Sequence, residues 1–317
     1  MAYLLLMIGF ALLIKGADLF VEGSSNIARL LRVPSLLIGL TIVAFGTSSP
    51  EATVSIIAAL EGNADVALGN VIGSNVFNLT LVVGLAAFLY PLKVESATVK
   101  KEIPFTLLAS IVLLILMSDV ALQGFSQNLL TRSDGFIFLS FFAIFMYYVL
   151  EVAKNSRSNT PQQPIPSGLR WGKNITVTLI GLIAIVFGGD LVVKNSTTIA
   201  YSLGMSEALV GLTIVAIGTS LPELVTSVMA ALKKQSEIAI GNIVGSNIFN
   251  ILFVLGASSV ISPLAVNNKV FVDVIVMIFF TAVLLLFSRT RYRIGKLEGL
   301  TLVFVYLVYL IFIIIRN

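Results

Sequence analysis

Long apolar segments alternate with short polar ones along this chain of 317 residues. A helix that spans a lipid bilayer needs about 20 mostly apolar residues. By that criterion the pattern predicts ten spans, at 3–28, 34–60, 65–90, 103–121, 132–153, 173–201, 207–232, 237–262, 270–288 and 298–316. The one polar connection of any length, 154–170, is rich in Asn, Ser, Gln and Pro, which is typical of a flexible linker. The predicted fold is therefore an all-α integral membrane protein.

The composition supports this class and excludes several functions. Hydrophobic residues make up 57% of the chain and charged residues only 11%, whereas a soluble domain holds about 25% charged residues. The absence of Cys and His excludes disulfides, thiolate chemistry and imidazole metal sites. The sequence contains no basic patch with interleaved aromatic residues, which would predict nucleic-acid binding. It also contains no GxSxG motif, which would predict a hydrolase. We expect no enzyme, no cofactor and no obligatory protein partner.

The basic residues predict how the chain is oriented. Fifteen of the 20 Lys and Arg residues fall in alternate loops on one side of the predicted membrane. The other side holds only Arg132, Lys269 and Arg316. Because basic loops stay on the cytoplasmic side, we expect the 154–170 linker to be cytoplasmic and both termini to lie outside, in a multi-pass protein of the cell membrane.

Two pairs of motifs recur in the chain at the same offset. "GLTIVAFGTSSPE" at 39–51 recurs as "GLTIVAIGTSLPE" at 211–223, and "ALGNVIGSNVFN" at 67–78 recurs as "AIGNIVGSNIFN" at 239–250. Each repeat holds five predicted spans, and an odd number makes the second repeat enter the membrane from the opposite side. We therefore expect a first repeat over 1–153, a linker over 154–170 and an inverted second repeat over 171–317. In such proteins the binding site lies near the midplane, where the repeats meet.

The second predicted span carries a helix-breaking pattern. Gly46 can end a first half-helix near Phe45 as a left-handed cap, and Pro50 suits the first turn of a second half-helix. Such a break would leave backbone carbonyls, including that of Ala44, without helical partners, beside Glu51. The second repeat holds the same pattern in Gly218, Thr219, Ser220, Pro222 and Glu223.

The two glutamates are the strongest candidates for a functional site. An ionisable group at mid-membrane usually has a function and a partner, and no Lys or Arg of the repeats pairs with Glu51 or Glu223, so a cation is expected. Carboxylates, hydroxyls, amides and carbonyls form an all-oxygen set that suits a hard ion such as Ca²⁺. Two carboxylates can be neutralised by one divalent ion, by two Na⁺ or by two protons, and this mutual exclusion is the physical basis of antiport.

"GTSSPE" with "GNVIGSNVFN", and "GTSLPE" with "GNIVGSNIFN", resemble the two α-repeats of the sodium/calcium exchanger family, within the calcium/cation antiporter superfamily. The resemblance implies a secondary antiporter that exchanges Na⁺ for Ca²⁺ by alternating access, with broken helices 2, 3, 7 and 8 lining the ion site. It also implies that spans 1 and 6 slide across the rest of the protein. The implied ion ligands are Glu51, Glu223, Thr47, Ser48, Thr219, Ser220, Ser74, Ser246, Asn78, Asn250 and the carbonyls of Ala44 and Ala216.

Some positions depart from the family pattern or leave alternatives open. Asn250 stands where some relatives carry Asp, so we expect exchange to be independent of K⁺; three Na⁺ per Ca²⁺ would make it electrogenic. Asp18 and Asp190 match a recurring acidic position in spans 1 and 6, although an ion pair with Lys15 explains Asp18 equally well. The alternative function is an H⁺/Ca²⁺ exchanger of the same fold. A passive cation channel is less favoured, because the sequence shows no ring symmetry.

Overall fold

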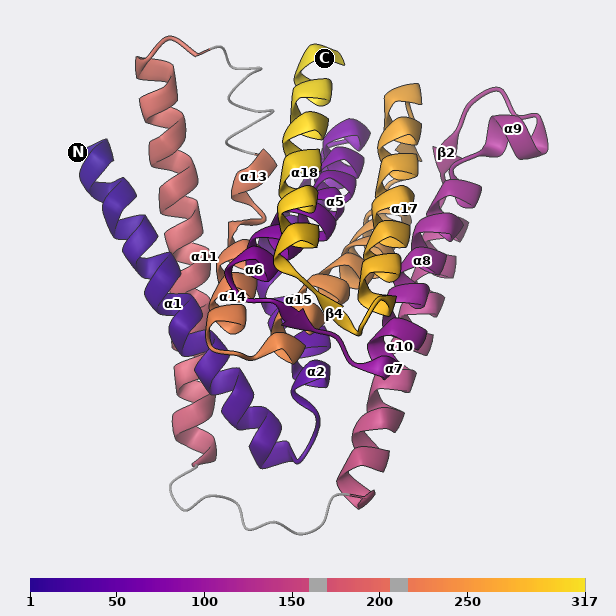
Figure 1. Ribbon diagram of the computed structural model, residues 1–317. Helices are drawn as coiled ribbons and strands as arrows, with labels where there is room; N and C mark the ends of the chain where they lie inside the picture. Colours follow the sequence, from indigo (N-terminus) through magenta and orange to yellow (C-terminus); the bar gives the residue numbers. More distant parts are fainter. Residues whose placement is uncertain (160–169, 206–215, 317) are drawn as a thin grey trace.

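The computed structural model describes residues 1–159, 170–205 and 216–316. The described chain is almost entirely helical (Figure 1). Within the described residues, seven helices are long and apolar enough to span a membrane, and a further passage is a pair of helices bent by 50°. The predicted class, an all-α membrane protein, is confirmed.

The first half of the chain, 1–159, contains ten α-helices, two π-helices and two short strands. In chain order these are α1 (Ala2–Leu31), α2 (Ser35–Ile38), the π-helix η1 (Gly39–Val43), α3 (Ala44–Thr47), α4 (Ser49–Leu60), α5 (Ala64–Phe77), the π-helix η2 (Asn78–Val82), α6 (Val83–Leu89), β1 (Leu92–Lys93), α7 (Ser96–Lys100), α8 (Glu102–Leu116), α9 (Asp119–Gln123), β2 (Leu129–Leu130) and α10 (Arg132–Asn159).

The described part of the second half follows a similar order. Its elements are α11 (Trp171–Ser202), α13 (Ala216–Gly218), α14 (Leu221–Leu232), α15 (Ser236–Ile248), the π-helix η4 (Phe249–Leu255), α16 (Gly256–Ile261), β3 (Leu264–Ala265), α17 (Asn268–Arg289), β4 (Arg293–Ile294) and α18 (Lys296–Arg316).

Eight of the ten predicted spans coincide with a membrane-length helix or with the bent pair. The fourth, predicted at 103–121, corresponds to α8, which has only 15 residues and ends at Leu116. The seventh, predicted at 207–232, is described from Ala216 onward, and its residues before that position lie outside the described residues.

The centre of the bundle is formed by two continuous passages, Ala64–Leu89 and Ser236–Ile261. In Ser236–Ile261, 94% of the most apolar stretch is buried inside the protein. In α10, which faces the surroundings, the corresponding share is 17%. Both passages run without a sharp bend, so the prediction that helices 3 and 8 are broken is not confirmed. Neither sequence contains Pro, so the backbone hydrogen bonds continue, and each helix widens into a π-helical segment instead.

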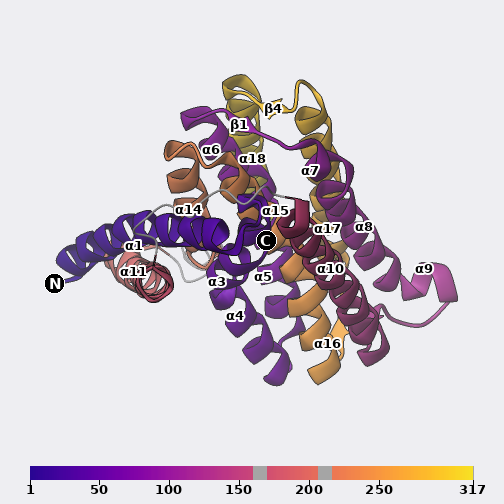
Figure 2. The same cartoon turned by 90° about the horizontal axis from the view of Figure 1, so that it is seen from below.

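Helices α1 and α11 lie side by side at one edge of the bundle (Figures 1 and 2). Glycines let their backbones approach closely. A Cβ atom on Gly16 would lie 2.9 Å from the carbonyl oxygen of Gly181, and one on Gly188 would lie 2.9 Å from that of Gly9. Each of these two helices therefore makes its main contact with the other.

In the described part of the chain, two short antiparallel ladders connect its halves. β1 pairs with β4, with Leu92 opposite Ile294, and β2 pairs with β3, with Leu130 opposite Leu264. The N-terminus and the C-terminal end of α18 point toward the same end of the bundle (Figure 1).

Candidate ion site at the centre of the bundle

The bend between α3 and α4 positions Glu51. Helix α3 ends at Thr47, Ser48 occupies the N-cap, and α4 begins with Pro50 in its first turn. The bend therefore falls at Ser48 and not at Gly46, which remains helical, so the predicted left-handed cap is wrong. Gly46 serves packing instead, because a Cβ atom there would lie 3.1 Å from Leu182.

Glu51 and Glu223 occupy equivalent places in the two halves. Each lies in the first turn of a 12-residue helix, α4 and α14 respectively, and each is 0% exposed. The N-terminus of a helix carries a partial positive charge that favours a carboxylate. The start of each helix therefore favours a carboxylate at these two buried positions.

Each glutamate is bound by the serine of the other half. The Ser48 hydroxyl donates to Glu223 Oε1 at 2.7 Å, and the Ser220 hydroxyl donates to Glu51 Oε1 at 2.9 Å. These four side chains are all 0% exposed. The two copies of the motif thus form a single site, as the repeat predicts.

Other predicted ligands surround these pairs. Ser246 Oγ lies 3.4 Å from the carbonyl oxygen of Ala44 and 3.5 Å from Glu223 Oε1. The Ala44 carbonyl also accepts from the Ser48 backbone N–H at 3.0 Å. The prediction that this carbonyl lacks a helical partner is therefore wrong, because α3 continues past Gly46. Thr47 Oγ1 lies 3.1 Å from the carbonyl oxygen of Val43.

Several buried oxygens of the site have no hydrogen-bond partner among the described residues. A buried polar atom without a partner is costly and points to an unseen ligand. Glu51 Oε2 and Glu223 Oε2 are joined in this set by three predicted ligand atoms, Ser74 Oγ, Asn78 Oδ1 and Asn250 Oδ1. This group of oxygens offers carboxylate, hydroxyl and amide ligands, the set that hard cations prefer.

The remaining predicted residues are less well described. Thr219 Oγ1 lies 3.4 Å from Asn70 Oδ1, facing the other half of the molecule. Ala216 begins the short helix α13, and only its place in the backbone is described.

The sequence reasoning missed two asparagines that hold the site together. Asn70 donates to the carbonyl oxygen of Glu51 at 3.2 Å, and Asn242 donates to that of Glu223 at 3.4 Å. Asn242 Oδ1 also accepts from Thr47 Oγ1 of the other half at 3.0 Å. The repetition of both residues in the GN dipeptides of the motifs was the available signal.

The repeated motifs also contain two GxxxG pairs, Gly69 with Gly73 and Gly241 with Gly245, a spacing that favours close helix packing, and the second pair packs closely. A Cβ atom on Gly241 would lie 2.7 Å from the Leu36 carbonyl oxygen, and one on Gly245 would lie 2.6 Å from that of Leu40. For the first pair, Gly69 and Gly73, no heavy atom of the described residues lies within 4 Å. By the repeat, the neighbours expected for this pair are the counterparts of Leu36 and Leu40, at positions 208 and 212, which lie outside the described residues.

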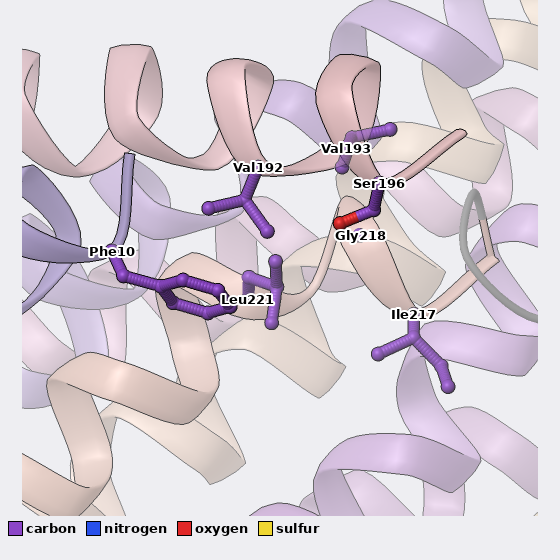
Figure 3. Close-up of a pocket in the computed structure, with 7 residues that line it drawn as sticks. All are labelled: Phe10, Val192, Val193, Ser196, Ile217, Gly218 and Leu221. Atoms are coloured by element: carbon purple, nitrogen blue, oxygen red, sulfur yellow. The ribbon is translucent and has the colours of Figure 1, made fainter. Parts of the chain in front are cut away.

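A largely apolar pocket of about 240 Å³ lies between α1, α11 and the start of α14 (Figure 3). It is lined by Phe10, Val192, Val193, Ser196, Ile217, Gly218 and Leu221. Leu221 is two residues from Glu223, but neither glutamate lines the pocket. The pocket therefore approaches the site from the α1–α11 side without reaching its carboxylates.

Asp18 and Asp190 lie away from the buried oxygens and form ion pairs. Asp18 pairs with Lys15 at 2.7 Å, one of the two alternatives that the sequence left open, and also with Lys233 at the end of α14, at 2.6 Å. Asp190 pairs with Lys194 of its own helix at 2.8 Å. The Asp18–Lys233 pair thus connects α1 to the rest of the bundle.

The fold and site define a helical membrane protein whose two repeated motifs enclose a buried group of oxygens. The chain belongs to the sodium/calcium exchanger family, because the family model described as "Sodium/calcium exchanger protein" matches residues 1–151 and 173–315. The predicted family and the predicted class, an ion antiporter of the membrane, are confirmed.

Individual relatives cover nearly the whole chain. The sodium/calcium exchanger MaX1 of Methanosarcina acetivorans is 33% identical to this chain, in a match that covers 98% of this chain and 97% of the relative. The CaxA protein of Alkalimonas amylolytica is 39% identical over 97% of each chain. A solved structure of the sodium-calcium exchanger NCX_Mj, soaked with 10 mM Na⁺ and zero Ca²⁺, superposes with a TM-score of 0.83 at 31% identity, covering 97% of each chain.

Proposed function

We propose that this protein exchanges Na⁺ for Ca²⁺ across the cell membrane by alternating access, with Glu51 and Glu223 as the central ligands of both ions. The observation that carries the proposal is a pair of reciprocal hydrogen bonds between the two halves of the chain. Each serine engages one oxygen of the opposite glutamate and leaves the other oxygen without a partner among the described residues. Two such oxygens from opposite halves are suited to bind one shared cation.

The proposed ligand set is the one that the family resemblance implies. The two carboxylates supply charge, and neutral oxygens complete the coordination that Ca²⁺ needs, about six to eight ligands. The neutral oxygens come from Thr47, Ser48, Ser74, Asn78, Thr219, Ser220, Ser246, Asn250 and the carbonyls of Ala44 and Ala216.

Charge balance explains why the two ions exclude one another. One Ca²⁺ neutralises both carboxylates, and so do two Na⁺, so the site crosses the membrane loaded with one kind of ion. If a third Na⁺ binds, the sodium-loaded site carries one net positive charge and exchange is electrogenic. With amides at Asn78 and Asn250 the proposed ligand set contains no third carboxylate, and we propose that K⁺ is not co-transported.

We propose ten spans arranged as two inverted repeats, 1–153 and 171–317, joined by a cytoplasmic linker at 154–170. An even number of spans fits the observation that both ends of the described chain point the same way (Figure 1), and loop charges place those ends outside. Alternating access would come from sliding of the α1–α11 pair, whose close glycine contacts favour movement as one unit.

Coupling to protons is the alternative, because the same two carboxylates can be neutralised by two protons. Proteoliposomes loaded with Na⁺ at fixed pH, or with acid in the absence of Na⁺, separate the two functions. Uptake of ⁴⁵Ca²⁺ that is driven by the outward Na⁺ gradient supports the proposal. Uptake that follows only the pH gradient would support the proton exchanger, and uptake that needs neither gradient would indicate a channel.

A further inference from the structure

Two buried asparagines outside the predicted ligand set contact the predicted ligands Asn78 and Asn250. Asn250 Nδ2 donates to Asn75 Oδ1 at 3.2 Å, and Asn78 Nδ2 donates to Asn247 Oδ1 at 3.3 Å. In each case the ligand belongs to one half of the chain and its partner to the other. All four side chains are 0% exposed.

These contacts decide which end of each ligand amide is free. A primary amide presents a donor NH₂ on one side and an acceptor oxygen on the other. Because the NH₂ groups of Asn78 and Asn250 are engaged, their oxygens are directed elsewhere. Both oxygens are among the buried atoms without a partner in the described part of the chain.

The direction of Asn75 is itself fixed by the backbone. Its Nδ2 donates to the carbonyl oxygen of Asn247 at 3.4 Å, and a backbone carbonyl inside a helix cannot turn over. Asn75 must therefore present its oxygen to Asn250. Asn247 has no such anchor among the described residues, because its own Nδ2 lacks a hydrogen-bond partner.

We infer that Asn75 and Asn247 are positioning residues that hold the amide oxygens of Asn250 and Asn78 toward the transported cation. This inference rests on the proposed function, because it takes those oxygens as ion ligands. Without the positioning residue the ligand amide can turn over and direct its NH₂ group at the cation. Partners that orient metal ligands typically contribute about 10- to 100-fold to metal affinity.

An Asp at position 250 would need no positioning residue. A carboxylate has two equivalent acceptor oxygens and therefore no wrong orientation. If Asn250 is replaced by Asp, Asn75 has nothing left to orient, and its oxygen faces a negative charge. The Asn75→Ala change should then be harmless or favourable, although it removes the same atoms from the core.

The test is a double-mutant cycle on the purified full-length protein. Calcium binding is measured by titration calorimetry with CaCl₂ in a buffer without Na⁺. The four proteins are the unaltered chain, Asn75→Ala, Asn250→Asp and the double variant. We expect Asn75→Ala to weaken Ca²⁺ binding about 10-fold, and to leave it unchanged or tighter when Asp is present at 250. Asn247→Ala should weaken Ca²⁺ binding by less, since the Asn247 amide has no backbone anchor among the described residues that fixes its orientation.

The control separates positioning from loss of structure. Thr281→Val removes a buried hydroxyl that donates to the Met277 carbonyl of its own helix α17 at 2.8 Å, and it should leave Ca²⁺ affinity unchanged. Melting temperatures are recorded for all variants. An equal loss of affinity from Asn75→Ala in both backgrounds, or no loss in either, would overturn the inference. Because the titration needs no gradient, failure of Na⁺-driven uptake in the unaltered protein would overturn only the proposed function.

Discussion

The Ser48 hydroxyl and the Glu223 carboxylate, 175 positions apart in the chain, lie 2.7 Å from one another inside the bundle. The mirror contact between Ser220 and Glu51 measures 2.9 Å. A hydrogen bond to a buried carboxylate is stronger than one between neutral groups. These two contacts make the site depend on both halves of the protein at once.

Removing one of these hydroxyls should therefore weaken ion binding. A hydrogen bond to a charged group contributes about 1.5–3 kcal/mol, so Ser48→Ala should lower Ca²⁺ affinity about 10-fold or more. The neighbouring Ser49 is a matched control, because its hydroxyl donates to the Phe45 carbonyl at 2.9 Å and is directed away from the glutamates. Calcium titration of both variants checks this, and equal affinities would contradict it.

The ion pair between Asp18 and Lys233 should restrain α1. Lys233 Nζ contacts both the carboxylate of Asp18, at 2.6 Å, and its backbone carbonyl, at 2.7 Å. Lys233→Met should therefore increase hydrogen–deuterium exchange in the part of α1 around Asp18. Lys194→Met is the control, because Lys194 pairs with Asp190 inside a single helix. Equal exchange in the two variants would show that the pair does not hold α1.

The close packing of α15 against α2 and η1 should be sensitive to the size of the side chain at position 241. A Cβ atom on Gly241 would lie 2.7 Å from the Leu36 carbonyl oxygen and 2.9 Å from Gly39 Cα. Both neighbours are backbone atoms, so Gly241→Ala should destabilise the fold by about 1–3 kcal/mol. Thermal unfolding in detergent measures the effect.

Gly172→Ala provides the comparison for that experiment. A Cβ atom at Gly172, in the first turn of α11, meets no heavy atom of the described residues within 4 Å. Alanine is the better helix former, so this variant should unfold at the same temperature or slightly higher. If both variants unfold alike, the close contact at Gly241 does not limit stability.

The repeat and its polar residues made much of the site predictable. Glu51, Glu223 and the serines beside them follow from one motif that occurs twice, and Pro50 marks the bent passage. The breaks predicted in helices 3 and 8 are not confirmed, because neither segment contains Pro and each helix continues through a π-helical segment.

The contacts between halves could not be predicted from the sequence. Asn70 and Asn242 donate to the backbone carbonyls of the glutamates. Every residue has such a carbonyl, so the sequence does not show which one accepts a side-chain hydrogen bond. The pairing of Asn75 with Asn250 depends on how α5 packs against η4 across the centre of the bundle. Such contacts are set by tertiary packing, which a local motif does not encode.

The central claim is that Glu51 and Glu223 both bind the transported ion. Uptake of ⁴⁵Ca²⁺ into Na⁺-loaded proteoliposomes tests it with Glu51→Gln, Glu223→Gln and Glu102→Gln. Glu102 is the matched control, because it is also buried, at 1% exposed, but accepts a hydrogen bond from Tyr148 outside the site. We predict that Na⁺-driven uptake is lost in the first two variants and retained in the third. Uptake that persists in either Glu51→Gln or Glu223→Gln would contradict the account.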